Sequence, residues 1–105
     1  PDINPNTAEY HKMRQLMHTK LTIINKLGLH ARAAAKLAST ASKFSCAIKI
    51  GRSEHELVDA KSVMSLMLLA ASNGTILHLD IQGSNAEEAH NAIQQLIANK
   101  FDEPQ

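Results

Sequence analysis

NKLGLHARAAAKLAS, residues 25–39, decides the fold because it joins two kinds of secondary structure within a few residues. The preceding segment, KLTIIN at 20–25, is rich in the β-branched residues that strands favour. Gly28 interrupts this pattern, and the alanine-rich run at 31–43 is a strong helix former. The stretch therefore predicts a strand that leads directly into a helix, with His30 at the helix entrance.

The rest of the chain continues this alternation of strands and helices. Strand-like segments follow at 46–50, 57–59 and 75–81, and amphipathic or apolar helical segments at 62–71 and 85–99. The order β-α-β-β-α-β-α predicts an α+β fold. We expect an open-faced β-sandwich, a four-stranded antiparallel sheet with three helices on one face.

The first 18 residues differ from this pattern. Their beginning is polar and rich in Pro and Asn, and Tyr10, Met13 and Met17 then recur at the spacing of a short amphipathic helix. We expect residues 1–18 to be an N-terminal extension, partly disordered or a short helix, and residues 19–105 to form one domain.

Composition excludes several classes of function. The chain has 105 residues, 11 basic and 10 acidic, so its net charge of +1 argues against the broad basic face that binds nucleic acid. Its single cysteine can form no internal disulfide. The longest apolar stretch, at 63–71, is too short to span a bilayer. We expect a soluble, cytoplasmic protein.

His30 and Arg32 form a candidate anion site at the start of the predicted helix. Unpaired backbone N–H groups and the helix dipole attract a phosphoryl group there, and the same field favours a neutral, nucleophilic imidazole. The guanidinium of Arg32 lies in the first turn, where it can neutralise phosphate oxygens. Phosphoryl transfer depends mainly on positioning and charge, so this chemistry needs no metal and no cofactor.

Several segments together resemble one protein family. GLHARAAAKLAS, AKSVMSLM, the NGT turn and the closing KFDE occur in the order found in the histidine phosphocarriers (HPr) of the bacterial phosphotransferase system, and the likeness is greatest to the nitrogen-related branch, NPr. It covers residues 20–103. The resemblance implies that His30 accepts phosphate on Nδ1 from enzyme I and passes it to an EIIA-type protein, with Arg32 neutralising the phosphate. It implies a monomeric carrier that does not act as a stand-alone catalyst.

Ala33 departs from the family motif, which has proline at this position. Proline in a first turn fixes φ and lacks an N–H that would be unpaired anyway. Its replacement by alanine removes some preorganisation but keeps the helix.

The apolar helix at 62–71 cannot bury all its sides on a single sheet. Leu66, Leu69 and Ala70 fit the core, which leaves Val63, Met64 and Met67 either as further core residues or as a flexible partner-binding surface. The family resemblance implies docking at the start of this helix. The basic row of Arg32, Lys36 and Lys43 suits an acidic partner or simply a solvated face.

Ser62 immediately precedes this helix and is a favoured N-cap residue. The resemblance implies a second role, because some family members are phosphorylated on the matching serine. Phosphate there would add negative charge beside the docking surface.

The remaining histidines show no spacing typical of a metal site, and we expect them to lie on the surface; they are His11, His18, His55, His78 and His90. Cys46 fits a small core residue. Two alternatives to the carrier remain: an ACT-like regulatory module that binds a small ligand on its open sheet, and an accessory protein whose phosphorylation state reports metabolic status.

Overall fold

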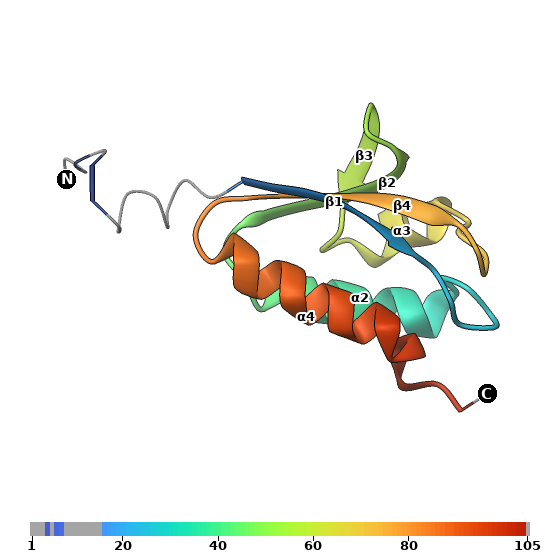
Figure 1. The fold of residues 1–105 in the computed structure, drawn as a ribbon. Coiled ribbons are helices and arrows are strands. Elements are labelled where there is room, and N and C mark those ends of the chain that lie inside the picture. Colours follow the sequence, from blue (N-terminus) through green and yellow to red (C-terminus); the bar gives the residue numbers. More distant parts are fainter. Residues whose placement is uncertain (1–3, 5, 8–15, 105) are drawn as a thin grey trace.

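A computed structural model describes residue 4, residues 6–7 and residues 16–104 of the chain (Figure 1). Its elements are β1 (Leu16–Thr22), α2 (Ala31–Ser42), β2 (Ala47–Ser53), β3 (Glu56–Asp59), α3 (Val63–Leu68), β4 (Ile76–Gln82), α4 (Ala86–Ala98) and the 3₁₀ turn η1 (Lys100–Asp102).

The four strands form one sheet in the order β1-β4-β2-β3, and every neighbouring pair is antiparallel. Helices α2 and α4 lie side by side under one face of this sheet, whereas no helix formed by the described residues covers the opposite face (Figure 1). The expected open-faced α+β sandwich is confirmed.

The core lies between the sheet and the helices. Alternate residues of the central strands point into it, including Ile48 and Ile50 of β2 and Leu77 and Leu79 of β4, all at most 1% exposed. Helix α2 presents a face composed mainly of alanines, which lack long side chains and let the helix backbone approach the sheet closely. The alanine run therefore supplies both helix propensity and a closely packed surface.

The β2–β3 hairpin bends out of the plane of the sheet. Gly51 permits the bend, because a Cβ there would lie 2.0 Å from the carbonyl oxygen of Glu56. Pairing of the two strands also shifts register between Ile50 and Ser53. The end of the hairpin consequently rises on the side away from α2 and α4 (Figure 1).

The first strand begins earlier than the sequence pattern indicates. β1 starts at Leu16 instead of Lys20 and ends at Thr22, and Met17 belongs to this strand, paired with Ile81, instead of to a short helix. The apolar–polar alternation that predicts such a strand is broken here, because apolar Leu16 is 64% exposed whereas polar Thr19 faces His90 of α4. The rest of the expected N-terminal helix lies outside the described residues.

Helix α3 is shorter than expected and ends at Leu68. Leu66 is fully buried and Leu69 is half-buried against the core, as expected, but Ala70 is exposed and adopts a left-handed backbone with φ of 50°. The Arg52 side chain donates hydrogen bonds to the carbonyls of Leu69 and Ala70, at 2.8 and 3.1 Å. Arg52 of β2 therefore stabilises the end of α3. No pattern within residues 62–71 predicts this contact.

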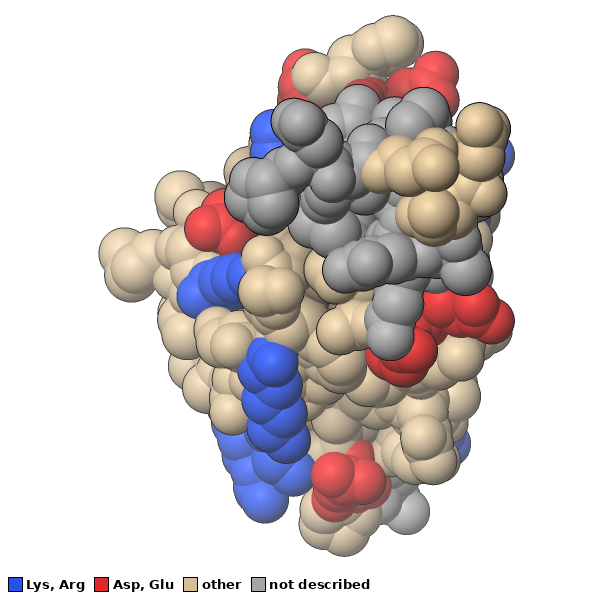
Figure 2. Space-filling model, turned by 90° about the vertical axis from the view of Figure 1, so that its left-hand side faces the viewer, with Lys and Arg blue, Asp and Glu red and all other residues tan. Residues whose placement is uncertain are grey.

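Charged side chains of both signs are scattered over the face seen in Figure 2. In Figure 2 basic groups gather at the lower left, while acidic groups lie at the top, right and bottom of the same view. None of the helices in the described part of the chain is long and apolar enough to cross a membrane.

We expect Gly51→Ala to lower the free energy of unfolding by about 2–4 kcal/mol, because the added methyl group meets backbone instead of a movable side chain. Chemical denaturation measures the loss. Lys49→Ala, an exposed position on the same strand, is the control and should change stability by no more than about 0.5 kcal/mol. A Gly51→Ala protein as stable as this control would contradict the proposed close approach.

Candidate functional site

His30 occupies the N-cap of helix α2, as the sequence predicts. Its backbone is extended, with φ of −74° and ψ of 179°, and its carbonyl accepts the first helical hydrogen bond, from the Ala34 N–H at 2.8 Å. The side chain makes no capping hydrogen bond, and the first turn contains no acidic residue. The positive end of the helix dipole is therefore free to act on an anion beside the imidazole.

The loop before His30 is held by the segment that follows α3. Leu29 donates its N–H to the carbonyl of Ala71 at 2.8 Å. Gly28 has φ of 67°, and a Cβ there would lie 2.5 Å from that same carbonyl oxygen. Glycine is required here both for its backbone conformation and for the close approach.

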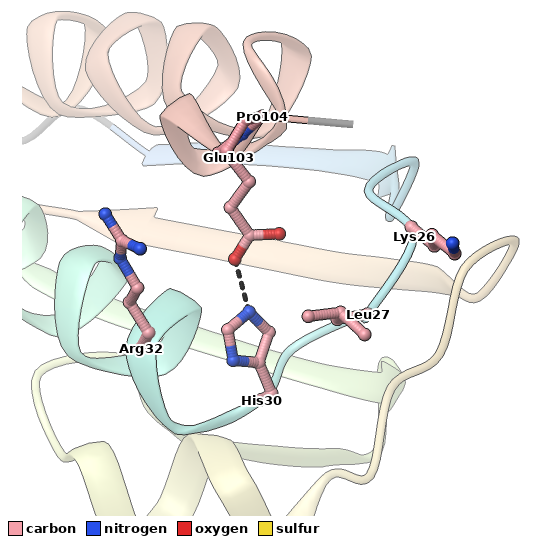
Figure 3. A pocket seen from close by; sticks show the side chains of 6 residues that line it. All are labelled: Lys26, Leu27, His30, Arg32, Glu103 and Pro104. Atoms are coloured by element: carbon pink, nitrogen blue, oxygen red, sulfur yellow. Dashed lines mark hydrogen bonds and ion pairs between the residues drawn. The ribbon is translucent and has the colours of Figure 1, made fainter.

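Glu103 is the side-chain partner of His30, from the opposite end of the chain (Figure 3). Its Oε2 forms a short hydrogen bond with His30 Nε2, and the Glu103 side chain is only 7% exposed. An ionised carboxylate can only accept, so Nε2 carries the proton, and in a neutral ring Nδ1 keeps its lone pair. Nδ1 lies on the side of the ring that faces the first turn of α2 (Figure 3).

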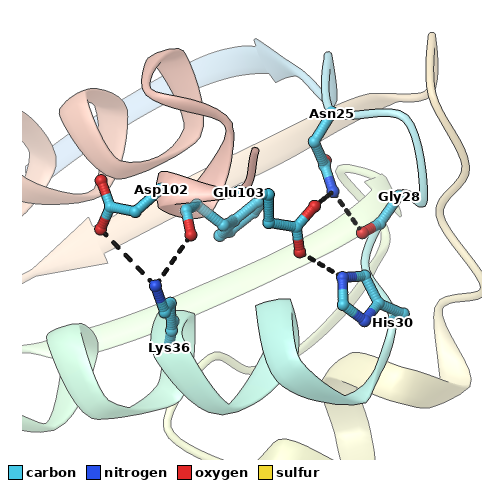
Figure 4. A network of polar contacts seen from close by, with 7 residues as sticks. Asn25, Gly28, His30, Lys36, Asp102 and Glu103 are labelled. Atoms are coloured by element: carbon cyan, nitrogen blue, oxygen red, sulfur yellow. Dashed lines mark hydrogen bonds and ion pairs between the residues drawn. The ribbon is translucent and has the colours of Figure 1, made fainter. Parts of the chain in front are cut away.

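One further contact holds the Glu103 carboxylate, and two neighbouring contacts fix the segments around it (Figure 4). Asn25 is fully buried and donates through Nδ2 to Glu103 Oε1 at 2.9 Å and to the Gly28 carbonyl at 2.7 Å. Phe101, fully buried, anchors the preceding turn, and Lys36 donates to its carbonyl at 3.0 Å. The amide of Asn25 thus links the loop before His30 to the carboxylate that orients the ring.

The pKa of Glu103 reflects opposing effects. Burial raises it, but the hydrogen bonds from Asn25 and His30 and the positive charges of His30 and Arg32 outweigh burial, so the pKa lies below its ordinary value of 4.5. Glu103 is accordingly an anion at neutral pH and can hold the Nε2 proton of His30 while Nδ1 stays open.

Arg32 lies on the exposed side of the first turn of α2 and lines the same pocket as His30 (Figure 3). The other residues of this pocket come from the β1–α2 loop and the C-terminal segment: Lys26, Leu27, Glu103 and Pro104. The site thus combines an imidazole, a guanidinium and a helix N-terminus around a hollow open to solvent, an arrangement suited to binding and transferring a phosphoryl group.

Comparison with known proteins identifies the family. The model of the PTS HPr component phosphorylation site matches residues 17–99. The chain belongs to the HPr family of phosphocarrier proteins of the phosphotransferase system. It is 52% identical to a phosphocarrier protein HPr of Pseudomonas aeruginosa, over 80% of this chain and 93% of that protein. It is also 44% identical to a phosphocarrier protein NPr of Shewanella violacea, over 83% of this chain and 94% of that protein.

Solved HPr structures have the same fold. An HPr of Thermoanaerobacter tengcongensis matches with a TM-score of 0.78 and 42% identity, over 85% of this chain and 99% of that one. An HPr dimer from the same organism matches with a TM-score of 0.65 and 44% identity, over 79% of this chain and 94% of that one. Membership of the HPr family favours the phosphocarrier hypothesis over the ACT-like alternative.

The expected partner surface of this HPr-family chain is exposed. Val63, Met64 and Met67 are 37%, 71% and 43% exposed, so they are not core residues. Leu68 and, in the loop before His30, Leu27 are among the apolar residues that the sequence pattern did not single out and that also lie in solvent. Exposed side chains of this kind mark interaction surfaces when they gather near a functional group.

Lys36 and Ser62 both have local structural roles. Besides its contact with Phe101, Lys36 lies 3.7 Å from Asp102, so it anchors the C-terminal turn as well as facing solvent. Ser62 is confirmed as the N-cap of α3, since its Oγ accepts the Ser65 N–H at 3.2 Å. Phosphorylation of Ser62 and partner binding by Lys36 stay predictions.

The sequence did not identify Asn25 or Glu103 as site residues. Asn25 follows an apolar run, and an asparagine at such a position predicts a turn. Its hydrogen bond to Glu103, 78 positions away, cannot be predicted from the neighbouring residues. Glu103 also lies beyond the segment that the family model matches. His90, expected on the surface, is instead buried on α4, 3.1 Å from Thr19 Oγ1 of β1.

We expect Glu103→Gln to lower the free energy of unfolding by about 1–2 kcal/mol at neutral pH, because it weakens charge-assisted hydrogen bonds to Asn25 and His30. The carboxyl's pKa is lowered on folding, so its stabilisation is complete above the ordinary value of 4.5 and is lost as the pH falls through the folded-state value. Denaturation at neutral pH and at about pH 3 should therefore show a difference that shrinks in acid. The exposed-site control is Glu56→Gln. A loss of stability in Glu103→Gln that does not depend on pH, or an equal loss in Glu56→Gln, would contradict this role of the Glu103 carboxylate.

We expect Ala33→Pro to raise stability by about 0.4–1 kcal/mol and to leave phosphorylation intact. Ala33 is the third residue of α2, where the N–H has no acceptor within the helix, so proline removes no helical hydrogen bond. Ala33 is also fully buried, so the melting temperature tests whether the added ring fits. A lowered melting temperature would count against this local structure.

Proposed function

We propose that this chain carries a phosphoryl group on Nδ1 of His30, accepting it from enzyme I and passing it to an EIIA-type protein of the cytoplasm in nitrogen-related signalling. The observation that carries the proposal is the Glu103–His30 pair, which leaves the Nδ1 lone pair beside the N-terminus of α2. The NPr of Shewanella violacea among the relatives supports the nitrogen-related branch.

Transfer in this scheme is a displacement at phosphorus. The Nδ1 lone pair forms a bond to the phosphorus of a donor phosphohistidine, and the donor's P–N bond breaks with its electron pair returning to the donor imidazole. Nε2 keeps its proton, so the His30 ring becomes a phosphoimidazolium next to the Glu103 carboxylate. An imidazole of the acceptor then attacks the phosphorus, and His30 leaves as a neutral ring.

Two positive groups stabilise the phosphoryl oxygens in this scheme. Arg32 lines the pocket, and the N–H groups of the first turn of α2 have no acceptor within the helix and no side-chain cap from His30. Glu103 has two opposing effects on the phosphorylated His30 ring. Its carboxylate stabilises the positive imidazolium but repels the negative phosphoryl oxygens. We propose that this repulsion keeps the phosphohistidine reactive toward the next carrier.

The exposed residues of α3 and the loop before His30 form the docking surface in this proposal. We define it by Leu27, Val63, Met64, Met67 and Leu68. Flexible thioethers suit a protein that must bind a donor and an acceptor in turn. Lys36, on the side of α2 that contacts the C-terminal turn, adds a positive charge for an acidic partner in this proposal. Phosphorylation of Ser62 would add negative charge at the start of α3.

The test is to incubate the protein with phosphoenolpyruvate and either the sugar-branch or the nitrogen-branch enzyme I, and to weigh the intact chain. We expect an acid-labile gain of one phosphoryl group that His30→Ala abolishes, with faster labelling by the nitrogen-branch enzyme. Arg32→Ala should slow transfer by about 10²-fold or more. The matched control is Lys43→Ala, at the far end of α2, which should label normally. No gain with either enzyme would refute the proposal.

A further inference from the structure

Three side chains that could ligate a metal meet on the open face of the sheet, away from the phosphoryl site. They are His18 on β1, His78 on β4 and Glu54 in the turn between β2 and β3, and one nitrogen or oxygen of each lies within 4.8 Å of the others. His18 Nε2 is 3.8 Å from Glu54 Oε2, and the two imidazole centroids are 6.0 Å apart.

The fold builds this cluster from two adjacent strands and the turn of a hairpin. His18 pairs with Asp80, and His78 pairs with Lys20, so the two histidines are diagonal neighbours on one face of adjacent strands. Their neighbours along each strand, such as Leu77 and Leu79, point into the core. Because of the bend at Gly51, the end of the β2–β3 hairpin rises on this same face (Figure 1). Glu54 in its turn consequently lies close to His18 and His78.

Two polar atoms of this face lack a partner. Within the described part of the chain, His78 Nδ1 and Asp80 Oδ1 are buried and accept or donate no hydrogen bond. Buried polar groups are normally satisfied by protein, water or an ion. A site that binds a hydrated cation would satisfy this requirement, and Asp80 is available to accept from a bound water.

We propose that His18, Glu54 and His78 bind a divalent transition metal ion, with Zn²⁺ as the best fit. Two imidazole nitrogens and one carboxylate oxygen are a common zinc donor set that leaves a fourth position for water. Ligand atoms around tetrahedral zinc lie roughly 3.3 Å apart, given bonds of about 2.0–2.1 Å. His18 and Glu54 are exposed, so rotation of their side chains can close the remaining distance.

The charges around the cluster are compatible with a cation. Asp80 lies directly across from His18 and adds a second carboxylate to that of Glu54. Lys20 and Lys49 flank the site on β1 and β2, but both are exposed, and their long side chains can keep their charges in solvent. His55, 85% exposed, lies 3.6 Å from the other Glu54 oxygen and is outside the three-residue set.

A metal bound here would fasten the hairpin turn to the two strands that it overhangs. Because zinc would bind the folded protein in preference to the unfolded chain, it should raise the melting temperature. The site is independent of the proposed phosphoryl transfer, since it shares no residue with His30, Arg32 or Glu103.

The test titrates the full chain, freed of metal by a chelator, with ZnCl₂ in a calorimeter and follows the melting temperature. We expect one zinc per chain and a raised melting temperature, with MgCl₂ giving neither. His18→Ala and His78→Ala should each weaken zinc binding by about tenfold or more. His55→Ala and His30→Ala are the matched controls and should bind as the unchanged protein does; His30→Ala also tests for zinc at the His30–Glu103 pair.

A second measurement does not depend on variants. Zinc should shift the imidazole NMR signals of His18 and His78 and leave those of His30 in place. Zinc affinity unchanged by both His18→Ala and His78→Ala, or imidazole shifts confined to His30 or His55, would overturn the proposal and leave the cluster as a surface ion pair.

Discussion

The carboxylate of Glu103 determines which nitrogen of His30 carries a proton, and the geometry of the phosphoryl site depends on that bond. The carboxylate is held by Asn25, whose amide also binds the loop before the helix, and by the turn that buried Phe101 anchors. A change in any of these residues would alter the ring's orientation without touching the ring. The proposed nucleophile, His30, is therefore oriented by contacts from both ends of the domain.

The alanine-rich face of α2 makes this arrangement possible. Small side chains let the helix lie close to the sheet, so α4 and its terminal turn can pack beside α2 and bring Glu103 over the N-cap. The same one-sided packing leaves the other face of the sheet without a helix. The helix-covered face thus carries the candidate phosphoryl site at its edge, and the other face carries the cluster of His18, Glu54 and His78.

Much of this could be predicted from sequence, because it depends on short-range patterns. Alternation and alanine propensity indicated the strand-to-helix junction, and residue type indicated Ser62 as a cap. His30 and Arg32 were placed together since they are separated by one residue at a helix start. The errors occurred at element ends: β1 begins at Leu16, and α3 stops before Ala70, where the side chain of Arg52 from β2 holds the chain in a left-handed turn.

The sequence by itself determined the order of strands and helices, the helix-end chemistry at His30 and the family, because each depends on neighbouring residues or on motifs in order along the chain. Only the tertiary structure decided that Glu103 meets His30 across 73 positions, and that histidines 60 positions apart meet on one face of the sheet. Strand register and helix packing set those distances. These distances are fixed only when the whole core is buried, so they cannot be predicted from the spacing of residues along the chain.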